Sequence, residues 1–354
     1  MKNFQLVSHT IEEITEDLAV LRQYQDPYNY LKDISAGLWR DLTTNPSVQA
    51  GDLVIILFLD GDAVVGRLGM WASEVAVGGV RSRTYWLSDF VLHEDYRSTG
   101  GGGMMLLKAI NHSSSLVAAG AIPPAVQELY VAVGFKELGP LRRYVYFYTP
   151  KVIFKTFLRI PFLPFALSIF AAGPLRAYYW LRRKSQKTSL EFRPVESFSD
   201  NINDLSRDGN YFPNSSHRLN WILTYRDNLF GVEVYRNEQI CGYCFYRTGL
   251  ADAQSEPRRL PEMKVGTLLD FYIEGASLQD KMALIDYSVR FFKPKQMEIF
   301  ECQVKDEELI AVCSARGLVQ VGGFRVLFRP DPTQRWTDGD SWHITQGEGD
   351  VLRN

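Results

Sequence analysis

The sequence of 354 residues is 46% hydrophobic and 23% charged, and its formal net charge is -2. This composition excludes a disordered chain, and the near balance of charge excludes a strongly basic scaffold, so no nucleic-acid partner is expected. Because the chain is longer than one hydrophobic core usually serves, the sequence predicts two domains.

The cysteines and the first residues favour a cytoplasmic protein. All four cysteines lie in the second half at uneven spacing, and no charged-then-apolar leader precedes MKNFQLVSHT. Cys241 and Cys244 form a Cys-x-x-Cys motif inside an apolar, aromatic run that is typical of a strand. Residues three apart on a strand point to opposite faces, so we expect structural cysteines rather than a metal site or a redox pair.

Hydrophobic periodicity predicts an α/β domain that ends near residue 150. The expected elements are a helix over residues 12–24, two strands within residues 51–73, a strand over residues 82–95, a helix over residues 102–112, a strand near residues 114–120, a helix over residues 124–133 and a closing strand over residues 142–149. A run of four glycines stands between the third strand and the helix that follows it.

The glycine run, residues 100–103, predicts an anion site. Without side chains, consecutive backbone N–H groups can turn toward one point, where the positive end of the helix dipole favours a phosphate. Arg97 at the rim can add a charge-assisted contact. The alternative is a flexible loop without a ligand, but four glycines weaken a helix start unless the backbone must stay bare.

The spacing around this run resembles the coenzyme A loop of the GCN5-related N-acetyltransferase (GNAT) superfamily. Neither the P-loop nor the dinucleotide-binding fingerprint fits the run. The GNAT loop pattern R/Q-x-x-G-x-G/A is followed about thirty residues later by Tyr-x-x-x-Gly-Phe, and both patterns are present. The matching residues are Arg97, Gly100, Gly102, Tyr130, Gly134 and Phe135. The resemblance extends over residues 50–150.

The resemblance implies an N-acyltransferase with acetyl-CoA, or another acyl-CoA, as cosubstrate and without a metal ion. The strand around Phe90 would pair with the pantetheine arm, and the amides of residues 98–103 would hold the pyrophosphate. The acyl thioester would lie between splayed strands, where an acceptor amine attacks it directly. The implied cofactor-binding residues are Val91, Leu92, Arg97, Ser98, Thr99, Gly100, Gly101, Gly102 and Gly103.

Direct attack requires an acid for the thiolate and a base for the amine. Tyr130 matches the tyrosine that protonates the thiolate in the family, and the alternative is an aromatic ring packed on the inner face of its helix. Asp89 is the candidate base, because we place it on the same strand face as Leu87, where the family often carries a carboxylate. Asp89 could instead be structural, His93 and Glu94 lie nearer to the loop, and a water-relayed base is a further alternative.

Three short stretches recur in the same order and predict a tandem duplication. The paired residues are Gly66 and Gly242, Asp89 and Asp270, and Gly134 and Gly317, at shifts of 176, 181 and 183 positions. In the second copy Leu278 stands at the position of Arg97, Cys313 at that of Tyr130, and QDKMALI replaces the glycine run. We therefore expect a second copy without the phosphate loop, and chance similarity between strands is the alternative.

The predicted fold is mixed α+β (α/β) with two tandem GNAT-like domains, each a mostly antiparallel twisted sheet flanked by helices. The expected divisions are an acyl-CoA-binding domain over residues 1–150, an apolar and basic linker over residues 151–188, a degenerate copy over residues 189–330, and a C-terminal surface loop with a short strand over residues 331–354. The last segment lacks the register of a calcium-binding loop.

The linker has an apolar centre and basic flanks. Residues 160–175 carry no charge and include three prolines, and every charged residue within 151–187 is basic. Sixteen residues are too few to span a bilayer. Residues 152–180 are therefore a candidate for peripheral contact with the inner face of a membrane, and a linker buried between the two halves is the alternative.

The leading hypothesis is an N-acyltransferase that acts on a small-molecule or glycolipid-type amine, such as an amino sugar in cell-envelope polysaccharide synthesis. An aminoacyl transferase of the peptidoglycan-bridge type is an alternative, although the coenzyme A loop and the near-neutral charge count against it. A non-catalytic peripheral-membrane binding protein is the third hypothesis. Tyr28, Tyr30 and Trp39 precede the sheet where the family places its acceptor-facing helices, and they fit a core equally well.

Overall fold

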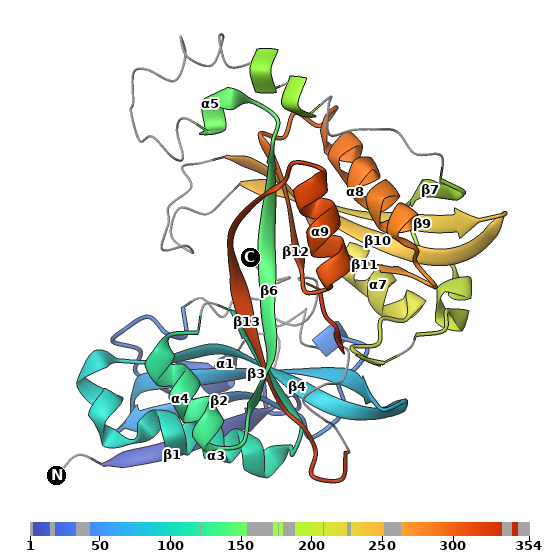
Figure 1. Ribbon diagram of the computed structural model, residues 1–354. Helices are drawn as coiled ribbons and strands as arrows, with labels where there is room; N and C mark the ends of the chain where they lie inside the picture. The colour runs from blue at the N-terminus through green and yellow to red at the C-terminus, as the bar shows by residue number, and fades with distance from the viewer. Residues whose placement is uncertain are drawn as a thin grey trace.

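The computed structural model describes residues 3–14, 18–32, 43–120, 122–153, 173–175, 177–179, 188–207, 209–224, 228–250, 263–334 and 342–345. Figure 1 shows two lobes connected by the long strands β6 and β13. Each lobe holds about half of the sequence, and the two lobes share one sheet.

The first half follows the predicted order of strands and helices. Its elements are β1 (Phe4–Thr10), α1 (Ala19–Arg22), β2 (Leu53–Asp60), β3 (Ala63–Val77), β4 (Val80–Leu92), the 3₁₀ helix η1 (Glu94–Thr99), α3 (Gly101–His112), β5 (Leu116–Gly120), α4 (Pro124–Ala132), β6 (Lys136–Phe147) and α5 (Pro150–Ile153). The helix expected over residues 12–24 is wrong in extent, because only four of the described residues there are helical. Trp39 lies outside the described residues.

The second half repeats much of this order of strands and helices. Its elements are β7 (Leu190–Val195), the 3₁₀ helix η3 (Asp200–Asp204), β8 (Asn210–Tyr211), α7 (Ser216–Thr224), β9 (Leu229–Arg236), β10 (Gln239–Leu250), β11 (Lys264–Ile273), α8 (Leu278–Phe292), β12 (Ile299–Val304), α9 (Glu307–Ala315), β13 (Val319–Arg329) and β14 (Trp342–His343).

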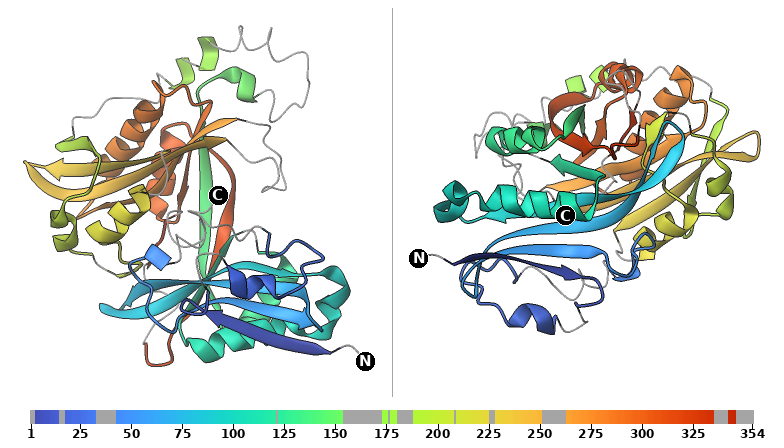
Figure 2. Two further views of the ribbon diagram at one scale, coloured as in Figure 1. Left: turned by 180° about the vertical axis from the view of Figure 1, so that it is seen from behind. Right: turned by 90° about the horizontal axis from the view of Figure 1, so that it is seen from below.

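The strands form one continuous sheet, in the order β1-β2-β3-β4-β5-β13-β6-β12-β11-β10-β9-β7, with β8 and β14 attached beside this path. Pairs are antiparallel except for β4–β5, β11–β12 and β8–β14 among the described strands. Helices α3 and α4 cover one face of the first-half sheet, and α8 and α9 lie together on the second-half sheet (Figures 1 and 2). The predicted mixed α+β class, with mostly antiparallel sheets and flanking helices, is confirmed.

The last strand of each half lies beside strands of the other half. β13 follows the second-half helices, yet it pairs antiparallel with β5 of the first half. The end of β6, in turn, pairs antiparallel with β12 of the second half. β13 and β6 also pair with each other, so they cross from one lobe to the other as a two-stranded connection (Figure 1).

The pairing geometry repeats between the halves as the sequence anchors predict. Gly66 of β3 pairs with Leu92, three residues after Asp89, and Gly242 of β10 pairs with Ile273, three residues after Asp270. Gly134 and Gly317 follow the equivalent helices α4 and α9, with φ of 93° and 84°. These positive φ values favour glycine, which explains why this residue recurs at both helix ends.

The region between the halves is described only in part. Tyr179 is buried, and its ring lies 4.1 Å from that of Tyr146 on β6. Most of the expected apolar segment, residues 154–172, lies outside the described residues. Within the described part of the chain, none of the helices combines the length and the apolar character that crossing a bilayer requires.

One expectation about the second half needs correction. Cys241 and Cys244 lie on a strand as predicted, but both side chains enter the same core cluster, because the register of β9 and β10 shifts at Cys241. Burial raises the pKa of both thiols, which leaves them as structural residues. The short strand predicted in the C-terminal segment is present as β14, and Trp342, Ile344 and Thr345 are buried.

Candidate functional site

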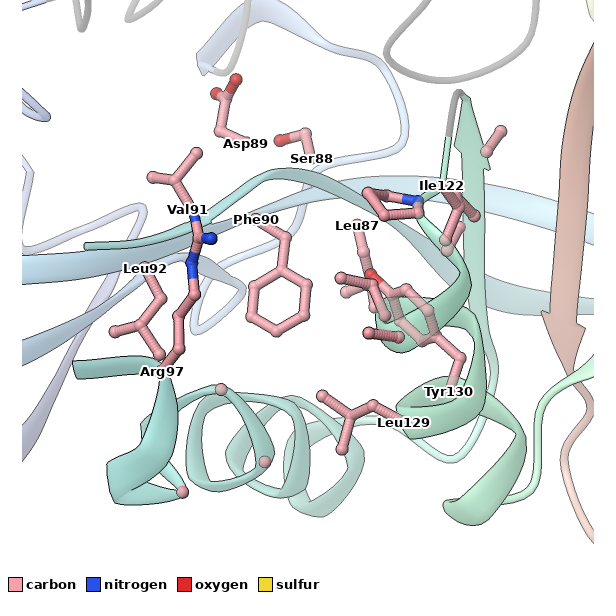
Figure 3. Close-up of a pocket in the computed structure, with 18 of the residues that line it drawn as sticks. Leu87, Ser88, Asp89, Phe90, Val91, Leu92, Arg97, Ile122, Leu129 and Tyr130 are labelled. Carbon is pink, nitrogen blue, oxygen red and sulfur yellow. The ribbon is translucent and has the colours of Figure 1, made fainter. Parts of the chain in front are cut away.

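The parallel strands β4 and β5 separate after a short paired stretch. Their last paired residues are Leu87 and Ala118, and β4 continues beyond that point to Leu92. A cavity of about 820 Å³ lies between the separated ends, with the start of α3 and the inner face of α4 as further walls (Figure 3). The predicted site residues that line it are Asp89, Val91, Leu92, Arg97, Gly100, Gly102, Gly103 and Tyr130.

The four glycines have different structural roles. Gly100 has a φ of 79° and ends the 3₁₀ helix η1, so it turns the chain into α3. Gly101 is buried, and a Cβ there would lie 2.5 Å from the Phe58 ring, which makes it a packing residue. Gly102 and Gly103 line the cavity, at positions of α3 whose amides have no acceptor within the helix. These two residues keep the helix start bare on the cavity side.

The residues just before the glycines build the turn rather than the cavity wall. The Thr99 hydroxyl donates to the Tyr96 carbonyl at 2.6 Å and accepts from the Gly101 amide at 3.3 Å. Ser98, Thr99 and Gly101 do not line the cavity, whereas the exposed Arg97 does. Arg97 is therefore the cation of this segment that lies at the rim.

Tyr130 lies on the inner face of α4 and reaches the cavity from below β4 in Figure 3. Its ring contacts Phe135 and Phe90 edge to face, at centroid distances of 4.8 Å and 6.0 Å. The residue is 3% exposed, and burial raises the pKa of its hydroxyl well above the ordinary value. Tyr130 thus combines a packed ring with a protonated hydroxyl at the cavity.

Asp89 does not share a face with Leu87, so that expectation is wrong. The register of β3 and β4 shifts between Arg67 and Gly69, and Asp89 has a φ of 48°. A bulge of this kind adds one residue to β4 and reverses the alternation of side chains. Figure 3 shows Asp89 and Leu87 on opposite sides of β4. Asp89 therefore lies at the cavity on the face away from Tyr130.

Arg67 is a buried residue next to this site that the sequence did not single out. Its Nη2 lies 3.7 Å from Asp89 Oδ1, and its Nη1 donates to the Tyr30 carbonyl. The Tyr30 amide donates to the Asp26 carboxylate at 2.7 Å, and Tyr30 lines the cavity. A lone arginine in the apolar stretch AVVGRLGMW was the available signal, because a buried guanidinium needs acceptors nearby.

His93 and Glu94, the alternative bases, lie outside the cavity lining. The His93 ring stacks on Tyr28 at a centroid distance of 3.8 Å. Its Nδ1 accepts a 3.4 Å hydrogen bond from the amide of Asp95, at the start of η1. These contacts give His93 and Tyr28 a structural role beside the mouth of the cavity.

The equivalent helix start in the second half is occupied by the chain's own side chains. α8 begins with a capping box, in which Ser277 Oγ accepts from the Asp280 amide at 3.2 Å and Asp280 accepts from the Ser277 amide at 3.0 Å. Arg236 donates to the same carboxylate at 3.0 Å. An anion already sits at this helix N-terminus, which agrees with a second copy that lacks the glycine run.

Asp270, the counterpart of Asp89, is a structural residue. It is 3% exposed, and its carboxylate accepts hydrogen bonds from Asn214 at 2.8 Å, Tyr243 at 2.8 Å and Thr345 at 2.7 Å. Cys313, the counterpart of Tyr130, is buried with its sulfur 3.8 Å from that of Cys302. The second half has therefore replaced both candidate catalytic positions by packed groups.

Comparison with known proteins identifies the fold. No family model matches the sequence, and no curated protein sequence is significantly similar to it. Among solved structures, Saccharomyces cerevisiae N-myristoyltransferase with bound myristoyl-CoA and inhibitors is 12% identical, with a TM-score of 0.56, over 100% of this chain and 85% of that chain.

Two bacterial structures are similar to this chain over 92% of its length and 72% of their own. A GCN5-related N-acetyltransferase from Anabaena variabilis is 13% identical with a TM-score of 0.50, and a probable N-acyltransferase from Enterococcus faecalis is 11% identical with a TM-score of 0.52. At these identities the likeness establishes the fold. The chain has the GNAT fold, and the match over its whole length corresponds to the tandem arrangement predicted from the sequence.

Proposed function

We propose that this protein is an acyl-CoA-dependent N-acyltransferase that uses acetyl-CoA or a longer acyl-CoA. The observation that carries the proposal is the cavity between the separated ends of β4 and β5, which extends from Gly102 and Gly103 at the start of α3 to Tyr130 on α4. One end offers bare amides and the guanidinium of Arg97, which suit a pyrophosphate. The other end is apolar, which suits an acyl group.

Acyl-CoA, when bound, would supply a thioester carbonyl for attack by the amine. The amides of Gly102 and Gly103 would hold its pyrophosphate. Val91 and Leu92 lie on the part of β4 beyond its last pair with β5, where the backbone groups that point away from β3 can bond the pantetheine arm. Ser98, Thr99 and Gly101 would support this arrangement through the turn and its packing.

Tyr130 and Asp89 would act from opposite sides of β4. The raised pKa of Tyr130 keeps its hydroxyl protonated at neutral pH, so it can donate to the departing thiolate. The Asp89 carboxylate, whose side chain is 36% exposed beside Arg67, can bind the ammonium form of an acceptor and take its proton directly or through water. In this division the acid would face the cosubstrate and the base would face the acceptor.

The acceptor we propose is an amine, such as an amino sugar of a cell-envelope precursor. Asp89 and Tyr30, which line the cavity, favour a polar, cationic acceptor. We further propose that residues 1–150 supply the cosubstrate site and that residues 189–330 shape the acceptor side. If the acceptor is of the glycolipid type, we propose that residues 152–180 contact the inner face of the membrane that carries it.

The test is calorimetric titration of the purified protein with acetyl-CoA and with acyl-CoAs of increasing chain length, followed by an acceptor screen. The screen incubates the best-bound acyl-CoA with amino sugars and other primary amines, and it measures release of free thiol. We expect saturable binding and amine-dependent thiol release. Binding of acyl-CoA without turnover on any amine would favour a non-catalytic role. If no acyl-CoA binds, the proposed function is wrong, and only the similarity of fold to acyltransferases stands.

A further inference from the structure

The sheet that carries the first-half cavity includes a strand from the second half, although no residue of that strand lines the cavity itself. β13 pairs with β5 along the edge that faces away from β4. Leu327 of β13 is buried in the same core cluster as Tyr130, under α3 and α4. Val326 and Phe328 enter the core cluster on the opposite face of the sheet. β13 is thus an integral part of the sheet that carries the cavity.

Helix α4 depends on contacts outside itself for its position. It has nine residues, and no side chain caps its N-terminus. A helix of this length is marginal without tertiary contacts, and its last carbonyls have no donors within the helix. Leu129 and Tyr130, which line the cavity, lie in its last turn. Any shift of this end of α4 therefore changes the cavity directly.

The amides of Gly134 and Phe135 bond the carbonyls of Val131 and Tyr130, and Arg329 at the end of β13 adds a side-chain donor to the next exposed carbonyl at this helix end. Its Nε donates to the carbonyl of Val133, the C-cap of α4, at 3.1 Å. Its Nη1 donates to the carbonyl of Ser114, just before β5, at 2.5 Å. A guanidinium at a helix C-terminus also interacts favourably with the helix dipole. One side chain thereby links the end of β13 to the C-terminus of α4 and to the segment just before β5.

We propose that Arg329 is a positioning residue for the cavity, and that the second half sets the distance between Tyr130 and β4 through it. Arg325, four residues earlier on β13, adds a hydrogen bond to Gln127 on the exposed side of α4. The effect on acyl-CoA binding rests on the proposed function. The anchoring of α4 does not, because it needs no ligand.

The experiment compares hydrogen exchange in α4 and in α8 for the wild type, Arg329→Met, Arg329→Lys and Arg193→Met. Arg193 on the edge strand β7 is a matched control, since its guanidinium donates to two exposed carboxylates, Glu191 on the same strand and Glu238 in the turn between β9 and β10. For Arg329→Met we expect exchange in residues 124–133 to accelerate by about tenfold or more, with exchange in α8 unchanged. Arg329→Lys keeps one cationic donor, so we expect an intermediate rate.

Acetyl-CoA affinity gives the second measurement. Arg329→Met is expected to raise the Kd by about threefold or more, because the end of α4 is no longer held in place, whereas Arg193→Met leaves it unchanged. Unchanged exchange in α4, or equal acceleration in α4 and α8, would overturn the proposal. If the wild type binds no acetyl-CoA, the proposed function fails, and the exchange rates still decide whether Arg329 anchors α4. Should Arg329→Met not fold, the comparison rests on Arg329→Lys.

Discussion

Replacing Gly102 by valine tests the phosphate-binding part of the site. A Cβ at Gly102 would lie 3.4 Å from the Phe90 ring, 3.8 Å from Leu129 and 3.9 Å from Leu92. These are ordinary van der Waals distances, so we expect the variant to fold, with an unfolding free energy within about 1 kcal/mol of the wild type. The added methyl groups occupy the part of the cavity from which a phosphate would approach the amides of α3.

The expected loss of affinity follows from the hydrogen bonds that valine blocks. A hydrogen bond to a charged group contributes about 1.5–3 kcal/mol, so the loss of one raises the Kd by about 10- to 200-fold. Calorimetric titration with acetyl-CoA measures this change. The matched control is Gly249→Val at the exposed end of β10, where a Cβ meets no atom within 4 Å. Equal affinity in the two variants would refute a phosphate site at Gly102.

Three further predictions concern packing, catalysis and pH. Gly101→Ala places a Cβ 2.5 Å from the Phe58 ring, so we expect urea denaturation to report a loss of about 1–3 kcal/mol. Tyr130→Phe should lower kcat with an accepted amine by about 100-fold while the Kd for acetyl-CoA stays constant, and unchanged kcat would remove Tyr130 as the acid. Burial lowers the pKa of His112, whose Nε2 accepts from the Leu53 amide, below its ordinary 6.5. The unfolded chain then binds the proton more tightly than the folded chain does. The contribution of neutral His112 to the unfolding free energy is therefore complete above about pH 6.5 and decreases below it. A melting temperature that stays constant between about pH 7.5 and 5.5 would contradict this prediction.

The strand, the glycine turn and the following helix could be predicted because each depends on local sequence. Alternation of apolar residues predicts β4, the glycine run predicts the turn, and apolar periodicity predicts α3. Gly134 is a similar case, because its φ of 93° is a local requirement of the chain leaving α4. The fold class follows from these local signals, and most of the predicted site residues line the cavity.

Features that depend on distant contacts could not be predicted. The bulge that turns Asp89 away from Leu87 arises from the register of β3 against β4, which the sequence of β4 alone does not contain. Gly101 resembles its three neighbours in sequence, and only the position of Phe58 separates its role from theirs. The exchange of β6 and β13 between the halves could not be predicted either. The residue pattern of each strand predicts a strand but does not indicate which half it pairs with.

A buried ion pair explains why the exchanged arrangement is specific. Arg143 on β6 donates to Glu301 on β12 at 2.5 Å, and the Thr267 hydroxyl donates to the other carboxylate oxygen at 3.1 Å. If β6 paired within the first half, both charges would lose their partners, at a cost of about 3–5 kcal/mol. The pair thus favours β6 in the second half, which leaves the place beside β5 for β13 and hence for Arg329. A half without a glycine run therefore supplies a strand to the sheet that carries the cavity of the other half.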